Sequence, residues 1–561
     1  MKRSVRRAPS NAFDRRAGGF PGRPRGPSCK FATVRLPVFL HRVTMLRRSQ
    51  GRSRRHPVEA TLATLRAVLG RPSSWFCWAG ALLATAPAWI VRYAPLQDLP
   101  FHVATLRLVH SYRDPAYGFT DDFIWNLGGT QYALYYLVGS ALAYLVGVAA
   151  ASVALTSLYL GGTVLALRAL LAALNKDIRL CIFVVPLLVN VMFLYGLMPF
   201  VCGIPLMFAA LATSVRFVAA PTRGRGVLLA LLSLALFYTH VVPYALFGLG
   251  YAALFPWTRR RKWLAATLPV VPSLGAVLWW IGLAPQGKQA AGALGAAFRH
   301  SPYAEAMGRL PQWTMDVFRD STDEWHFIAL VVVGLLAIGL SQGDPDRSSP
   351  AARALAVVPI ACAALYFSTG SDLGDVWLFC ERFPVPGMMS VIPLLRMPRG
   401  LRGVIVSGMA LALAVSSTVN VCEHFIRFQL EEVGDFDEAI AAMEPRKRVA
   451  ALIYDKGSAI VNDAPFLHFG SYYQARKGGL VMFSYSSFLF WPIRFRPGHF
   501  PPPGTRPRLR WEWTPESVPM QELYPYYDYV LTRGGGFSPP PGTFHLAWHG
   551  QRWSVYARDS R

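Results

Sequence analysis

Long apolar runs recur between about residues 74 and 422, and they constrain the fold of this chain more than any other feature. The runs are about 15 to 22 residues long, with short polar segments between them. A helix of about 20 apolar residues spans the hydrocarbon core of a bilayer. Hydrophobic residues make up 53% of the chain and charged residues only 16%, which is too apolar for an ordinary soluble protein. The sequence therefore predicts an α-helical polytopic membrane protein.

The basic residues of the chain are unevenly distributed. A net charge of +26 could indicate nucleic-acid binding, but residues 1–70 alone hold 17 Lys or Arg against two acidic residues. This segment is rich in Pro, Gly and Ser, so we predict a basic disordered tail. Most other basic residues before 422 flank apolar runs, as at cytoplasmic helix ends. We expect no nucleic-acid partner. A start at Met45, which would leave residues 1–44 outside the native protein, is an alternative.

The positive-inside rule gives a topology for residues 71–422. It places the N-terminus in the cytoplasm and the loop 94–131 on the outer side. The segment 132–147 is apolar but short, and a crossing there would turn every later basic loop outward, so we predict an interfacial helix. About eleven transmembrane helices are expected, near residues 74–93, 152–173, 178–195, 199–219, 226–239, 241–257, 263–283, 326–341, 354–369, 383–396 and 402–422.

Residues 423–561 differ in composition from the apolar region, since they are polar, aromatic and Pro-rich. They contain strand-like runs such as RVAALIY (448–454) and a helix-like run, APFLHFGSYYQARKG (464–478). This pattern predicts a small C-terminal α/β soluble domain. Eleven crossings would place it outside the membrane, with His468 on the same side as the loop 94–131.

Several polar residues stand at the outer ends of the predicted spans. Asp98 follows the first apolar run in APLQDLPFH, and His102 comes four residues later. His240 lies in YTHVVP, and Glu381 and Arg382 lie in CERFP. Polar residues at membrane depth tend to line sites or cavities. Each also has an ordinary structural alternative: a helix cap for Asp98, helix-end packing for the others.

These residue types suit the transfer of a sugar from a lipid phosphate. A carboxylate such as Asp98 can act as general base for the acceptor hydroxyl. Arg382 and His240 are candidates to contact the phosphate, whose charge Arg can stabilise through paired hydrogen bonds. His102 and Glu381 complete the predicted substrate-binding set.

Several of these motifs resemble those of the GT-C superfamily of integral membrane glycosyltransferases. QDLPFH around Asp98 resembles the acidic motif of the first outer loop, and GGTQYALYYLVGSALAYLVG (128–147) resembles the interfacial segment after it. YGLMPFVCGIPLMFAALA (195–212), YTHVVPYALF (238–247) and ERFP (381–384) resemble patterns of bacterial members. The resemblance implies a GT-C-like fold, a polyprenyl-phosphate-linked sugar as donor, and a glycan, lipid or protein acceptor. Asp98 would be the catalytic residue, in a bacterial inner membrane.

The chain departs from the family pattern in its acidic residues. Many members carry two adjacent acidic residues in the first loop, whereas Asp98 stands between Gln97 and Leu99. The pair Asp121–Asp122 lies further along, where a solvated turn is the plainer interpretation. If a divalent cation such as Mg²⁺ or Mn²⁺ takes part, Asp98, Asp121 and Asp122 are its candidate ligands.

Two other classes of function remain open from the sequence. A transporter or flippase would place charged or broken-helix features near the bilayer midplane, and prolines do interrupt some spans. The acidic residues, however, gather at one face. A non-catalytic membrane scaffold with an outer binding domain, including an inactive relative of the enzyme, is the third interpretation.

Overall fold

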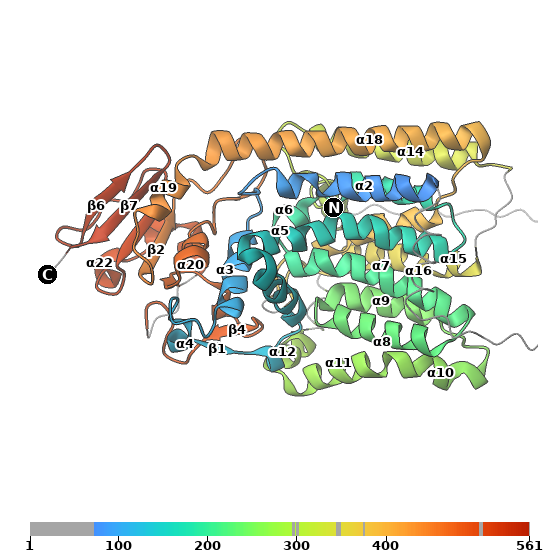
Figure 1. Ribbon diagram of the computed structural model, residues 1–561, viewed down its shortest axis with the longest axis horizontal. Helices are drawn as coiled ribbons and strands as arrows, with labels where there is room; N and C mark the ends of the chain where they lie inside the picture. The colour runs from blue at the N-terminus through green and yellow to red at the C-terminus, as the bar shows by residue number, and fades with distance from the viewer. Residues whose placement is uncertain are drawn as a thin grey trace, which may run out of the picture. The chain divides into compact units, whose positions relative to one another are not determined.

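The computed structural model describes residues 72–293, 295, 298, 302–343, 349–373, 376–503 and 509–559. The predicted basic tail, residues 1–70, lies outside the described residues. The described part is mostly helical, with a small sheet formed by the C-terminal region. Figure 1 shows the long helices side by side, and the sheet beyond one end of them.

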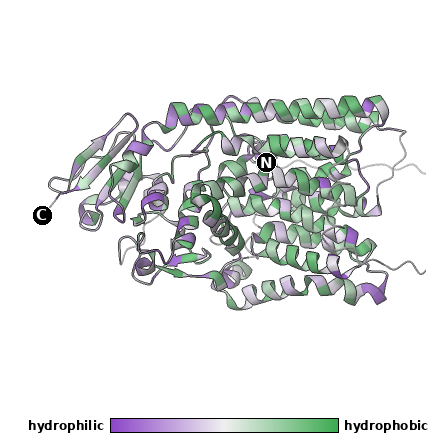
Figure 2. Cartoon of the chain, in the orientation of Figure 1, coloured by the Kyte–Doolittle hydropathy of each residue, from purple (hydrophilic) through white to green (hydrophobic). Residues whose placement is uncertain are grey.

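Six helical segments in the described part of the chain are long and apolar enough to cross a membrane. They are α5 (Ala133–Ala173), α7 (Met198–Ala219), η3 to α11 (Arg260–Leu283), α14 (Thr322–Leu340), α15 to α16 (Pro350–Ser368) and α18 with η7 (Gly400–Val433). In five of them less than 40% of the apolar window is buried within the protein, whereas α7 is 89% buried. Hydrophobic residues dominate these helices (Figure 2). Exposed apolar helix surface of this extent fits lipid contact, so the chain is a helical membrane protein.

The prediction of eleven spans is wrong, because several predicted spans fold into elements too short to cross. Residues 226–239 lie in α8 (Arg223–Phe237, 15 residues), and residues 241–257 lie mostly in α9 (Val241–Leu254, 14 residues). At 1.5 Å per residue these helices are about 21 to 23 Å long, below the roughly 30 Å hydrocarbon core.

Prolines shorten two further predicted spans, since proline removes a backbone donor and disrupts a helix. Residues 178–195 form a 3₁₀ helix that contains Pro186, η2 (Ile178–Leu187), and then α6 (Val191–Leu194). Residues 383–396 form α17 (Pro384–Val391) and η6 (Ile392–Leu394). The first predicted span becomes α2 (Pro72–Trp89), which has 18 residues but is not among the six apolar segments.

The segment 132–147 is the first arm of α5, not a separate helix. Gly147 interrupts the helical backbone with φ 80° and ψ 162°, a conformation that favours glycine. The two arms of α5 run in different directions on either side of this break (Figure 1). Tyr144 and Leu145 in the first arm are exposed. An interfacial position for this arm stays a prediction.

The C-terminal region forms a five-stranded mixed sheet in the order β3-β2-β5-β7-β6. Its strands are β2 (Arg448–Ile453), β3 (Leu480–Val481), β5 (Tyr529–Arg533), β6 (Phe544–His549) and β7 (Trp553–Arg558). β2 pairs in parallel with β3 and β5, and the remaining pairs are antiparallel. The helix α20 (Ser471–Lys477) connects β2 to β3, as a parallel pair requires.

The loop 94–131 packs against this C-terminal region. Its helix α3 (Leu99–His110) packs against α20, and Arg107 Nε donates a hydrogen bond of 2.9 Å to the carbonyl of Ala475. The strand β1 (Phe123–Trp125) pairs antiparallel with β4 (Ile493–Phe495). Segments far apart in the sequence therefore meet next to Asp98.

The remaining helical elements of the described residues are short. They are α4 (Phe119–Asp122), η1 (Leu127–Gly129), α12 (Pro285–Ala293), α13 (Tyr303–Arg309), η5 (Cys380–Arg382), α19 (Phe436–Ala441), η8 (Tyr485–Ser487), α21 (Leu509–Trp513), η9 (Pro515–Ser517) and α22 (Met520–Leu523).

Candidate active site

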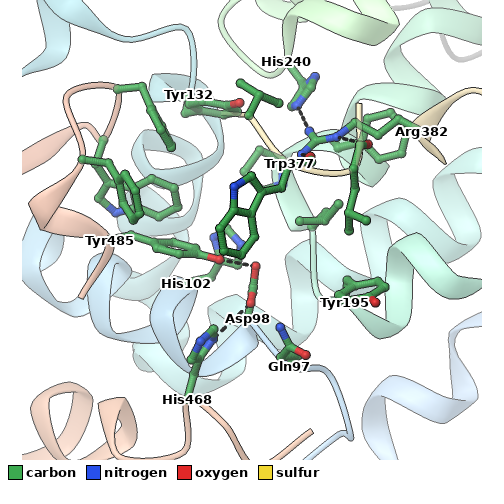
Figure 3. A pocket seen from close by; sticks show the side chains of 18 of the residues that line it. Gln97, Asp98, His102, Tyr132, Tyr195, His240, Trp377, Arg382, His468 and Tyr485 are labelled. Carbon is green, nitrogen blue, oxygen red and sulfur yellow. Dashed lines mark hydrogen bonds and ion pairs between the residues drawn. The ribbon is translucent and has the colours of Figure 1, made fainter. Parts of the chain in front are cut away.

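A cavity of about 450 Å³ opens where α3, the ends of several membrane helices and the C-terminal region meet. Asp98, His102, His240 and Arg382 all line it, although they are spread over nearly 300 residues of sequence. In Figure 3 the Asp98 carboxylate and the Arg382–His240 pair lie at opposite sides, with the indole of Trp377 between them. The structure thus brings together four of the five catalytic and substrate-binding candidates.

The Asp98 carboxylate is turned into the site and does not cap its own helix. Asp98 occupies the N-cap position of α3, but its side chain makes no capping hydrogen bond. The backbone N–H of Asp98 donates to the carbonyl of Tyr195 at 3.1 Å, which anchors the start of α3 on the segment before α7. The helix-cap interpretation of Asp98 does not describe this side chain.

Both oxygens of Asp98 have partners from the C-terminal region. Asp98 Oδ1 lies 3.0 Å from His468 Nδ1, and the hydroxyl of Tyr485 donates a hydrogen bond to Oδ2. His468 Nε2 lies 3.0 Å from Glu512 Oε1, and the ring of Phe101 stacks on His468 with centroids 3.9 Å apart. The result is a buried row of Asp98, His468 and Glu512 in which the charges can alternate.

The protonation of this row follows from its surroundings. Burial alone lowers the pKa of His468, but the carboxylates of Glu512 and Asp98 outweigh it and raise that pKa to about 9. His468 is therefore a cation at neutral pH. Burial, and next the charge of Asp98, raises the pKa of Tyr485 well above its ordinary value, so the Tyr485 hydroxyl keeps its proton. A cation and a hydrogen-bond donor thus flank the Asp98 carboxylate.

The pKa of His468 predicts a pH-dependent contribution to stability. The folded pKa of about 9 lies above the ordinary value of 6.5, so the contribution is complete below pH 6.5 and disappears as the pH rises through 9. We expect the Tm of the detergent-solubilised protein to exceed that of His468→Gln by more at pH 6.5 than at pH 9.5. Thermal unfolding of both proteins across this range is the measurement. A difference in Tm that stays constant would contradict the assignment.

His102 contributes an uncharged group to the cavity wall. Burial lowers its pKa to about 4, so the ring is neutral at pH 7. Its Nδ1 lies 2.7 Å from the hydroxyl of Tyr136. His102 therefore supplies no positive charge to the cavity wall.

Arg382 and His240 form the basic side of the cavity. Arg382 donates hydrogen bonds to the carbonyls of Leu378 (3.1 Å) and Trp377 (3.0 Å), and its Nη1 lies 2.9 Å from His240 Nε2. His240 Nδ1 already accepts a hydrogen bond from the Val242 N–H at 3.1 Å.

A neutral imidazole carries one proton and cannot accept at both ring nitrogens. With Nδ1 an acceptor, Nε2 carries the proton, and it faces another donor in Arg382. A negatively charged oxygen bound against both side chains would accept a hydrogen bond from each. This geometry is suited to an anion.

Two groups of predicted residues lie elsewhere. Glu381 is buried but does not line the cavity. Asp121 is exposed in α4, and Asp122 Oδ1 lies 3.2 Å from His499 Nδ1. Neither Asp121 nor Asp122 lines the cavity with Asp98.

The residues present do not fit the predicted divalent-cation site. Asp98 stands apart from the other two candidate ligands, and the positively charged His468 lies 3.0 Å from one of its oxygens. Within the described ranges, no group of three or more His, Cys, Asp or Glu side chains is arranged to hold a metal ion. We therefore derive no step through a metal.

Sequence reasoning missed the residues that hold Asp98. It placed His468 only on the same side of the membrane, and it named neither Tyr485 nor Glu512. It also missed the aromatic wall of the cavity, formed by Tyr132, Phe200, Trp377, Phe488, Phe490, Trp491 and Trp513. Single Tyr, Glu and Trp residues in a polar aromatic segment carry no local signal. Their role comes from contacts with distant parts of the chain.

Comparisons with known proteins identify no relative, so a function must be inferred from the geometry of this cavity. A scan against protein-family models found no match, and a search of curated proteins found no match either.

Proposed function

We propose that this chain is a membrane glycosyltransferase that transfers a sugar from a polyprenyl-phosphate donor to an acceptor on the outer face of a bacterial inner membrane. One observation carries the proposal. In an aromatic-lined cavity of about 450 Å³, the buried carboxylate of Asp98 faces the buried Arg382–His240 pair. A glycosyl transfer of this kind needs two groups: a base that accepts the proton of the acceptor, and a basic group that stabilises the leaving phosphate.

The Arg382–His240 pair supports phosphate binding. Both side chains present donors to the same space, and phosphate oxygens accept charge-assisted hydrogen bonds from such groups. In the reaction, the bond between the anomeric carbon and the phosphate oxygen breaks, and the lipid phosphate leaves with the electron pair. Arg382 would stabilise the charge that develops on that oxygen.

Asp98 supports the acceptor half of the reaction. The acceptor hydroxyl oxygen forms the new bond to the anomeric carbon, and Asp98 takes its proton as general base. The faces of Tyr132, Trp377 and Trp491 can pack against the C–H surfaces of sugar rings. The apolar membrane helices next to the cavity would hold the polyprenyl chain.

A GT-C-like architecture is part of this proposal. The acidic residue before α3, the angled first arm of α5 and a C-terminal region packed on the first loop support it. In this arrangement the first arm of α5 lies at the membrane interface, the N-terminus is cytoplasmic and the C-terminal region is extracytoplasmic. This topology needs an odd number of crossings, so the proposal includes α2 as a span in addition to the six apolar segments.

The test is label transfer in proteoliposomes that hold a pool of polyprenyl-phosphate sugars and candidate acceptors. We expect label from the donor to become covalently attached to an acceptor, and protein-free liposomes are the control. Labelled lipid that crosses the bilayer without chemical change would instead assign a transporter or flippase. Neither transfer nor crossing would favour the scaffold interpretation.

Arg382 should control the affinity for the phosphate group. A hydrogen bond to a charged group contributes about 1.5 to 3 kcal/mol, or roughly 10- to 100-fold in affinity. We therefore expect Arg382→Gln to weaken polyprenyl-phosphate binding by at least about tenfold. Binding of a labelled polyprenyl phosphate to protein in micelles is the measurement. Arg427→Gln, which changes an exposed arginine paired with Glu431, is the matched control. Equal affinity in all three proteins would contradict this role.

A further inference from the structure

We infer that His468 is a positioning residue of this site, because it orients the Asp98 carboxylate that acts on the acceptor. The inference rests on the proposed function, and it adds a role for the C-terminal region in the chemistry itself. His468 lines the cavity next to Asp98, and it affects the reaction by holding the Asp98 carboxylate.

The His468 ring is held by contacts at both of its nitrogens and at one of its faces. Nδ1 faces Asp98 Oδ1 and Nε2 faces Glu512 Oε1, each at 3.0 Å. Phe101 stacks on one ring face with an interplanar angle of 25°, and the ring of Tyr485 meets it edge-on at 6.1 Å. A charged ring held in this way keeps its Nδ1 in an ion pair with Asp98 Oδ1.

The Asp98 carboxylate is oriented in turn. His468 forms an ion pair with one oxygen and Tyr485 donates a hydrogen bond to the other, so the carboxylate is held at both oxygens. A general base works only when its side chain is held within about 0.5 Å of the productive geometry. The charged and titratable groups around His468 are Asp98 and His102 from α3, Glu512 from α21 and Tyr485 from η8.

The elements that carry these residues are packed together. His468 lies three residues before the start of α20, and its carbonyl accepts a hydrogen bond of 3.0 Å from the Ser471 N–H. The helix α20 packs on α3, which begins just after Asp98. The position of the base is therefore set by the docking of the C-terminal region on the first loop.

Steady-state kinetics of His468→Gln and Glu512→Gln test the inference. We expect His468→Gln to lower kcat by about 10- to 100-fold, with KM for the acceptor changed less than about twofold, because Asp98 is misoriented but the cavity keeps its shape. Glu512→Gln should lower kcat less, since His468 still faces Asp98. His499→Gln alters an exposed histidine paired with Asp122 and should match wild type. An unchanged kcat in His468→Gln would overturn the inference.

A double-mutant cycle on thermal unfolding keeps this test separate from the proposed function. The cycle compares the Asp98→Asn/His468→Gln double variant with the two single variants. If His468 holds Asp98, the decrease in Tm of the double variant will differ from the sum of the decreases of the single variants. Additive decreases would overturn the inference even where turnover is found. If wild type shows no turnover at all, the proposed function fails, and the cycle alone decides whether His468 positions Asp98.

Discussion

Replacing Asp98 with asparagine is expected to lower glycosyl transfer at least about a hundredfold, since a general base contributes 10²- to 10⁴-fold. Asparagine keeps the size of the side chain and can accept from Tyr485, but it cannot take the proton of the acceptor hydroxyl. Polyprenyl-phosphate binding should be nearly unchanged, because Arg382 and His240 lie at the other side of the cavity. Turnover and lipid binding of the same proteoliposome preparation measure the two effects separately.

Asp122→Asn is the matched control for this substitution. It removes a carboxylate from the same outer loop, in α4, outside the cavity, and should keep the turnover of wild type. Turnover in Asp98→Asn equal to that of the control would show that Asp98 only supports the fold. Loss of lipid binding along with turnover would instead indicate a collapsed cavity.

Replacing Gly196 with alanine is the second change with a large expected effect. Gly196 has φ +72°, and a Cβ there would lie 2.8 Å from the backbone nitrogen of Asp98 and 2.9 Å from that of Leu99. A non-glycine residue in this conformation costs about 1 to 3 kcal/mol, and the backbone around Asp98 must also shift. A displacement of about 1 Å can lower turnover by roughly a hundredfold. We expect a lower Tm and a loss of turnover of that order.

Gly248→Ala is the control for Gly196→Ala. Gly248 lies inside α9, and nothing stands within 4 Å of its Cβ position, so alanine there should leave turnover unchanged. Full turnover in Gly196→Ala would mean that the segment before α7 does not place Asp98.

The polar residues at helix ends could be located from the sequence because the runs around them are so apolar. At the ends of such runs, Asp98, His240 and Arg382 are surrounded by apolar residues, and a shared polar cavity satisfies all three side chains. Glu381 shows the limit of this reasoning. Adjacent residues point in different directions, and sequence alone does not tell which of Glu381 and Arg382 enters the cavity.

The number of spans and the partners of Asp98 could not be predicted, for two different physical reasons. An apolar run does not show how long its helix will be. The run around Pro186 forms a 3₁₀ helix, and the run that forms α9 is helical for only 14 residues. The hydrogen bond of Tyr485 to Asp98 joins residues 387 positions apart. Contacts of that separation depend on how whole elements pack, and no local pattern marks them.

The pairing of β1 with β4 has a consequence for the synthesis of the chain. Asn126, next to β1, donates a hydrogen bond to Leu489, which follows it by 363 residues. At about 5 to 20 residues per second, β4 leaves the ribosome roughly 20 to 70 seconds after β1. During that interval the first loop has an unpaired strand, and Asp98 lacks His468, Tyr485 and Glu512. Asp98 therefore gains its partners only after the membrane helices have been translated. Under the proposed function, a chain that ends before Tyr485 would insert into the membrane but show no turnover.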